Sequence, residues 1–137
     1  MTLTKEHHEL IDQTKEVRIE TFSTRGATET IIWIVVVGDD VYVRSVQGEK
    51  GHWYQRALSN PLVAILVDGE RIEFRAVPVD DPDVFEAVSS ALRDKYSPGG
   101  SLDRMTRDDV LDTTLRLDPA GVPPAAQASG SVLTDNG

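Results

Sequence analysis

The chain has 137 residues and a formal net charge of −9, so it provides for one domain with one core, and its charge opposes binding to nucleic acid or to anionic membranes. Cysteine is absent, which excludes disulfides, thiolate zinc sites and cysteine nucleophiles. Neither a basic leader followed by an apolar run nor a stretch approaching the roughly 20 apolar residues of a membrane span is present, so we expect a cytoplasmic protein.

The N-terminal part predicts a short helix and two strands. Thr4 can cap a helix over residues 5–14, and the helix and its exit fill residues 1–16. Val17–Thr24 alternates apolar with polar residues, the period-two pattern of a half-buried strand. Residues 30–37 are apolar on both faces and rich in β-branched side chains, which predicts a central strand covered on both sides.

Hairpin turns connect the next strands. Gly38-Asp39-Asp40 leads into a strand over residues 41–47, and Asp68-Gly69 joins strands over residues 62–67 and 71–79. The last of these alternates, so its charged residues share one outer face and predict a charge ladder: Arg71, Glu73 and Arg75.

A longer helix and a final strand complete the predicted domain. Asp81 caps a helix that begins at Pro82, runs to about Tyr96 and has an apolar residue at every fourth position. A polar connection then leads to a strand over residues 112–117. From Pro119 the chain is Ala, Pro, Gly and Ser, so we expect a domain of residues 1–118 and a disordered tail of residues 119–137.

These elements predict a mainly β protein with helices, a small six-stranded antiparallel β-barrel. A short helix stands at its N-terminus, another follows the third strand, and a longer helix precedes the last strand. The strands over residues 30–37 and 62–67 are apolar on both faces, although a small barrel has one interior. Part of the outside must therefore be covered too, and we expect a homodimer to cover it.

The segment Val41–Pro61 carries the candidate site. It passes from a strand through Gly48 and Gly51 into a short helix, and it gathers a local charge of +2 in an acidic chain from Glu49 and three basic residues: Arg44, Lys50 and Arg56. Charged donors, the Ser45 hydroxyl and closely approached backbone amides at a helix start are suited to a phosphate or another anion.

Two interpretations stay open for the side chains of the short helix. Trp53 and Tyr54 either flank a bound ring or seat the helix on the barrel, and their i,i+4 spacing to Ala57 and Leu58 favours seating. His52 and Arg56 form a polar pair that is suited to facing a ligand. No hydrolase motif is present, no catalytic residue is identified, and we expect no metal site because His7 and His8 point to different sides of a helix.

The order of these residues resembles a known superfamily, the flavin-binding split β-barrels, which include the pyridoxamine-phosphate-oxidase-like proteins and the deazaflavin-dependent nitroreductases. Trp53-Tyr54, Ala57-Leu58 and Asn60-Pro61 are similar to their W-Y-x-N-L-x-A-N-P segment, and the likeness covers about residues 17–117. The resemblance implies a dimer with FMN or a deazaflavin in a groove between subunits. The residues it points to as cofactor-binding are Arg44, Ser45, Lys50, Gly51, His52, Trp53 and Arg56.

Two functions follow from these observations. The basic segment favours a flavin-dependent oxidoreductase, nitroreductase-like, acting on a small organic substrate. Residues 24–28 read Thr-Arg-Gly-Ala-Thr, shorter than the Gly-Arg-Lys-Ser-Gly-like loop of the nitroreductases and without its lysine. That difference favours a non-catalytic barrel that binds another small ligand or serves as an interaction module.

Overall fold

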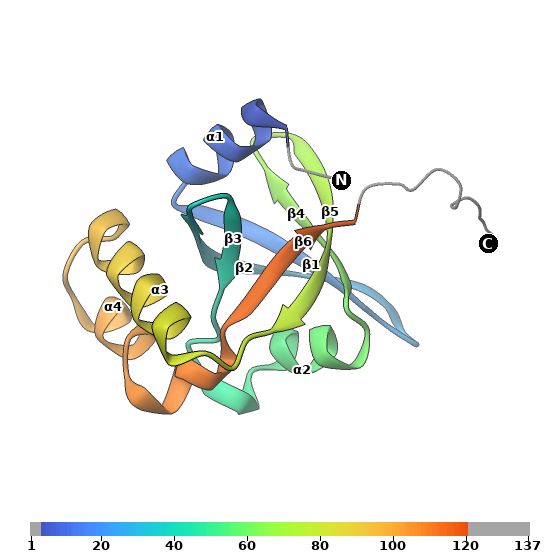
Figure 1. Ribbon diagram of the computed structural model, residues 1–137. Helices are drawn as coiled ribbons and strands as arrows, with labels where there is room; N and C mark the ends of the chain where they lie inside the picture. The colour runs from blue at the N-terminus through green and yellow to red at the C-terminus, as the bar shows by residue number, and fades with distance from the viewer. Residues whose placement is uncertain (1–3, 121–137) are drawn as a thin grey trace.

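Six strands form one closed antiparallel barrel in the order β1-β2-β3-β6-β5-β4, in a computed structural model that describes residues 4–120 (Figure 1). The strands are β1 (Glu16–Ser23), β2 (Gly26–Val37), β3 (Asp40–Val43), β4 (Leu62–Val67), β5 (Glu70–Pro78) and β6 (Leu115–Pro119). The predicted six-stranded antiparallel barrel is therefore confirmed.

The helices are α1 (Lys5–Gln13), α2 (His52–Ser59), α3 (Pro82–Lys95) and α4 (Gly100–Met105), with 3₁₀ turns η1 (Gly48–Lys50) and η2 (Asp108–Thr113). The predicted caps are present, because Thr4 accepts a hydrogen bond from the His7 N–H at 3.1 Å and Asp81 accepts one from the Asp83 N–H at 2.9 Å. The predicted polar connection before the last strand instead contains α4 and η2. None of the helices in residues 4–120 combines the length and apolar composition that a membrane crossing requires.

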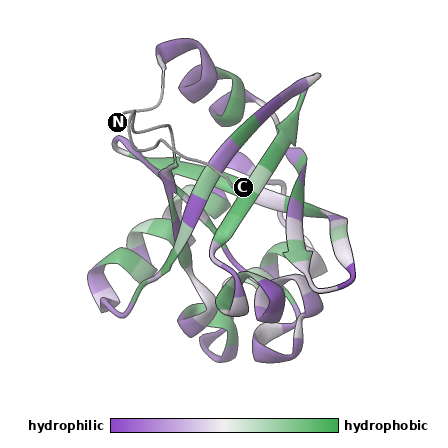
Figure 2. Cartoon of the chain, turned by 90° about the vertical axis from the view of Figure 1, so that its right-hand side faces the viewer, coloured by the Kyte–Doolittle hydropathy of each residue, from purple (hydrophilic) through white to green (hydrophobic). Residues whose placement is uncertain are grey.

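Inward-facing residues of all six strands fill the barrel, and two helices close its ends. Ile11 of α1 is fully buried, and α2 contributes Trp53, Tyr54 and Ala57 to the same core. Figure 1 shows α1 at the top of the barrel and α2 at the bottom. In Figure 2 the strands are banded in green and purple, which is the alternation of hydrophobic and hydrophilic residues that the period of two predicts.

A second core lies outside the barrel wall. The outer face of β2 and β3 packs against α3 and α4 through a cluster of apolar side chains: Trp33, Val35, Val37, Tyr42, Val84, Val88, Leu92, Tyr96, Leu102 and Met105. The expectation that a second subunit covers the apolar outside of β2 was therefore wrong for this part of the wall. The same chain covers it, because the apolar stripe of α3 matches the apolar outer residues of β2.

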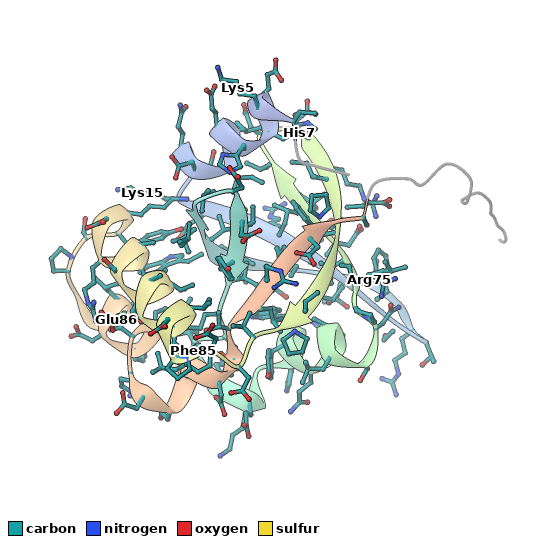
Figure 3. All side chains as sticks on the ribbon, in the orientation of Figure 1. Lys5, His7, Lys15, Arg75, Phe85 and Glu86 are labelled. Atoms are coloured by element: carbon teal, nitrogen blue, oxygen red, sulfur yellow. The ribbon has the colours of Figure 1, made fainter. Side chains whose placement is uncertain are left out.

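The outer face of the opposite wall is charged. Arg71 of β5 contacts Glu20 of β1 at 2.7 Å and Glu73 at 2.8 Å, and Figure 3 shows Arg75 projecting away from the barrel. The Arg71–Glu73 part of the predicted ladder is thus present, and it is extended across the sheet by Glu20.

Two strands differ from their predicted bounds. β3 ends at Val43 rather than at residue 47, because the Ser45 N–H donates to Thr113 Oγ1 at 3.0 Å and the Gly48 N–H donates to the Ser45 carbonyl at 3.0 Å. These local hydrogen bonds replace a ladder. β6 starts later than predicted and extends to Pro119, one residue into the predicted tail, whose residues 121–137 lie outside the described part of the chain.

Candidate functional site

The longest strand changes its partners along its length. β2 pairs with β1 over residues 26–33 and with β3 over residues 34–37. Beside the first half of β2, on the side where β3 would continue, a cavity of about 610 Å³ opens between this strand, α2 and α4. This volume lies in the range of small-molecule and cofactor sites.

Six of the seven residues predicted to bind a cofactor line this cavity, namely Arg44, Ser45, Gly51, His52, Trp53 and Arg56. The seventh, Lys50, is exposed at the end of η1 and is not among the lining residues. The folded chain therefore brings the segment between β3 and α2 to one wall of the cavity, with the lysine turned outside it.

Arg44 is buried and forms part of this wall. Its Nε donates to Thr114 Oγ1 at 2.9 Å and its Nη1 donates to Ser89 Oγ at 3.0 Å and to the Met105 carbonyl at 2.9 Å. Its Nη2 donates to the Phe85 carbonyl at 3.1 Å. Four of the five N–H groups of a guanidinium are thus used by neutral acceptors of the protein. Burial lowers the pKa of Arg44 to about 10, which leaves it cationic at neutral pH.

Ser45 and Gly51 lie in contact on either side of the 3₁₀ turn η1. Ser45 Oγ donates to the Gly48 carbonyl at 2.8 Å, and a Cβ placed on Gly51 would collide with the same Ser45 Oγ. Glycine is therefore favoured at position 51, because any larger residue would force the Ser45 hydroxyl to move away from the Gly48 carbonyl. This contact fixes the path of the backbone into α2, whose first residue is His52.

The residues of α2 divide between the barrel and the cavity. Trp53 is buried and meets Tyr54 edge-on at 6.2 Å between ring centroids, in the interior core, which supports the interpretation that both residues seat the helix. His52 is exposed, and Arg56 is half-buried with its Nε donating to Thr21 Oγ1 at 2.8 Å. His52 and Arg56 also line a neighbouring cavity near Phe22, so they are accessible from both sides of α2.

The cavity is lined by cations that the protein does not neutralise. Three arginines line it, Arg44, Arg56 and Arg104, and within residues 4–120 no carboxylate lies within 4 Å of any of them. Elsewhere in the described chain, five arginines pair with Asp or Glu: Arg18, Arg71, Arg93, Arg107 and Arg116. Glu16 is the one carboxylate among the lining residues. In a chain of net charge −9 this arrangement is suited to an anionic ligand.

The wall opposite α2 was not predicted from the sequence. Trp33 belongs to the strand that was predicted to be covered on both sides, yet it lines the cavity, together with Ser101, Arg104 and Met105 of α4. The signal for α4 was the spacing of its apolar residues Leu102 and Met105, which is helical. The sequence contains no pattern that places Trp33 at the cavity. Its position on the outer face of a covered strand does not reveal which part of its side chain stays accessible.

Comparisons with known proteins agree with this fold. Residues 8–117 match a family described as "Uncharacterized protein conserved in bacteria (DUF2255)". No curated protein matches the sequence.

Solved structures share the architecture at low identity. The heme storage protein HutZ of Vibrio cholerae is 17% identical, with a TM-score of 0.66 over 89% of this chain and 93% of that one. A candidate pyridoxamine 5′-phosphate oxidase of Listeria innocua is 13% identical, with a TM-score of 0.63 over 85% and 92%. An F420 reductase is 19% identical, with a TM-score of 0.58 over 87% and 97%. These likenesses establish the fold, a split β-barrel that this chain shares with them.

Proposed function

The chain belongs to the DUF2255 family. We propose that this member binds a flavin-type cofactor, FMN or a deazaflavin, in the cavity beside β2 and acts as an oxidoreductase on a small organic substrate. The observation that carries the proposal is the cavity, whose three arginines have no carboxylate within 4 Å in residues 4–120. The fold of the chain, which an F420 reductase shares, agrees with it. A phosphate-bearing ligand with a flat ring matches that chemistry.

The residues between β3 and α2 would hold the anionic end of the cofactor. Arg56 and His52 are the accessible donors there, and Arg44, which is buried in the cavity wall, contributes its positive charge. The hydroxyl of Ser45 is directed to Gly48, so Ser45 and Gly51 act by shaping the backbone. The cofactor would supply hydride or electron transfer, and the protein would bind and orient it.

A homodimer would complete the cavity. Ile31 and Val46 lie on its lining and are 60% and 38% exposed, although both are large apolar residues. Covering them with a second copy of the chain would remove apolar surface from water and shield the ligand. We therefore propose a dimer in which each cofactor is bound near the contact between two chains.

A second candidate function has its own support. Four N–H groups of Arg44 are engaged by the protein and Lys50 lies outside the cavity, so fewer free donors face a phosphate than the sequence predicted. HutZ, with the same fold, is a heme storage protein. A non-catalytic barrel that binds another anionic small ligand is the alternative.

The visible absorption spectrum of the purified protein and calorimetric titrations with FMN and with a deazaflavin test the cofactor. Riboflavin is the matched control, because it has the ring of FMN and lacks the phosphate. We expect FMN to bind at least about ten-fold more tightly than riboflavin, and Arg56→Gln to weaken FMN by about 1.5–3 kcal/mol. Arg75→Gln, on the outer wall, should have no effect. Absence of saturable binding by FMN and by the deazaflavin would contradict the proposal.

Sedimentation tests the dimer separately. A species of about 15.1 kDa at micromolar concentration, with and without FMN, would exclude the dimer and leave the cofactor proposal to the titrations.

A further inference from the structure

Trp33 lies where two cavities adjoin. It lines the cavity beside β2 and a second cavity of about 600 Å³ next to α4, and the two cavities share Glu16, Trp33 and Ser101. The indole is only partly buried. The two cavities therefore adjoin at an accessible tryptophan, next to α4 and not at Arg56 and His52 of α2.

The indole of Trp33 is held in a fixed orientation. The ring of Tyr96 stacks on it with centroids 4.0 Å apart and planes 4° from parallel. Tyr96 is itself fixed, because its hydroxyl donates to the Lys15 carbonyl and accepts the Ile34 N–H at 3.0 Å. A preoriented aromatic surface loses little freedom when a ligand ring packs against it, so it suits a flat ring.

Arg104 of α4 lines the same cavity as Trp33. Ser101, Arg104 and Met105 follow i, i+3, i+4 spacing and present one face of α4 to the cavity. Within residues 4–120, Arg104 is exposed and has no carboxylate within 4 Å, whereas Arg107 three residues on pairs with Asp109 at 2.8 Å. α4 is fixed in place by the bond from Arg44 to the Met105 carbonyl and by the packing of Leu102.

We propose that Trp33 and Arg104 form the substrate subsite and that the substrate is a planar aromatic monoacid. Its ring would lie against Trp33 and its carboxylate would pair with Arg104. Glu16, on the boundary shared by the two cavities, opposes a second negative charge on the ligand. The inference rests on the proposed function, because it assigns the end near Arg56 to the cofactor.

The test is calorimetric titration with 1-naphthoate, without FMN and with saturating FMN. Two control ligands separate the contributions: 1-naphthalenemethanol has the ring without the charge, and cyclohexanecarboxylate has the charge without the ring. We expect 1-naphthoate to bind about ten-fold more tightly than either, since each control ligand lacks either the charge-assisted contact or the aromatic contact.

Variants assign the two contacts. Arg104→Gln should weaken 1-naphthoate about ten-fold and leave 1-naphthalenemethanol unchanged, and Trp33→Leu should weaken both aromatic ligands about five-fold or more. The matched control Arg107→Gln, exposed on the same stretch and outside the cavity lining, should change neither affinity. Trp33→Phe keeps an aromatic ring and should retain most of the binding, which separates loss of the surface from loss of folding.

The outcomes distinguish this inference from the proposed function. Binding of 1-naphthoate that depends on Arg104 and Trp33, in a protein that does not bind FMN, would reject the cofactor and keep the subsite. No binding of 1-naphthoate with or without FMN, or binding that Arg104→Gln does not weaken, would overturn the subsite. A loss of FMN affinity in Arg104→Gln would also overturn it, because Arg104 would then belong to the cofactor end.

Discussion

The guanidinium of Arg44 and the hydroxyl of Ser89 meet at 3.0 Å inside the protein. This contact joins the end of β3 to α3, and the same guanidinium also bonds to Phe85, Met105 and Thr114. Three segments that are distant in sequence, α3, the end of α4 and the approach to β6, are thereby tied to one side chain. Arg44 thus fixes the position of α4, the helix that carries Arg104.

Replacing Arg44 should destabilise the protein strongly. Arg44→Gln leaves buried carbonyl and hydroxyl acceptors without their donor, and we expect the free energy of unfolding to fall by at least about 3 kcal/mol. Urea denaturation followed by circular dichroism measures the change. Arg25→Gln, in an exposed hairpin, is the matched control and should stay within about 0.5 kcal/mol of the wild type. A comparable stability of Arg44→Gln would show that these bonds contribute little.

The contact between Ser45 and Gly51 predicts a coupled pair of substitutions. Gly51→Ala should cost about 1–2 kcal/mol because the new Cβ collides with Ser45 Oγ. Ser45→Ala removes that oxygen, so the double variant should be less destabilised than the sum of the two single variants by about 1 kcal/mol. Gly100→Ala, where an added Cβ meets nothing within 4 Å, is the control and should be neutral or stabilising. Strict additivity would disprove the collision.

We expect the buried amine of Lys95 to make the free energy of unfolding depend on pH. Its Nζ donates to the Ile11 carbonyl at 2.9 Å and to the Ile34 carbonyl at 2.8 Å, and burial lowers its pKa to about 8. Between about pH 8 and pH 10.5 the unfolded chain keeps a proton that the folded chain has lost, so this group makes the free energy of unfolding rise with pH. Lys95→Met should lack that rise.

The measurement compares the unfolding of wild type and Lys95→Met at several values between pH 7.5 and pH 10. The range stops there because burial raises the pKa of Tyr96 to about 12, and above pH 10 the unfolded tyrosine releases its proton first, which lowers stability. Lys50→Met, at an exposed position, is the control. If the free energy of unfolding of the wild type minus that of Lys95→Met falls as the pH rises, the predicted sign is wrong.

Removing the hydroxyl of Tyr96 should lower the stability of the protein while the aromatic ring stays in place. Tyr96→Phe leaves the Ile34 N–H and the Lys15 carbonyl without this partner, so the free energy of unfolding should fall by about 1–3 kcal/mol. Tyr54→Phe is the matched control, because the Tyr54 hydroxyl has no hydrogen bond within residues 4–120 and its loss should cost less. Thermal unfolding measures both, and equal losses would contradict the role of the Tyr96 hydroxyl.

Much of the fold follows from local patterns in the sequence. The period-two alternation of β1 and β5, the caps at Thr4 and Asp81 and the turn at Asp68-Gly69 depend on nearby residues alone. The turn has positive φ at both positions, 49° for Asp68 and 81° for Gly69, which is why Asp-Gly predicts it. The cover on the outside of β2 was not predictable in this way, since it depends on which helix folds back against the strand.

The site was predictable on one side only. The segment between β3 and α2 is contiguous and basic, so its residues appear together in the sequence. Arg44 was identified as a ligand donor, but its acceptors lie on α3, on α4 and at Thr114 just before β6, and no local pattern reveals that the protein itself uses most of its N–H groups. Arg104 joins the cavity only because α4 packs on the outer core.

The two tryptophans of the chain lie in different surroundings, and this gives the protein two built-in optical reporters. Trp53 is 6% exposed and packs in the barrel core, although it also lines the cavity, so its emission should shift to longer wavelength when the barrel opens. Trp33 is partly buried where the two cavities adjoin, so its emission should respond to a bound ligand while the barrel stays closed. In Trp53→Phe, the remaining tryptophan fluorescence would come from Trp33 alone, so a change when ligand is added to the folded protein would report contact at the cavity wall.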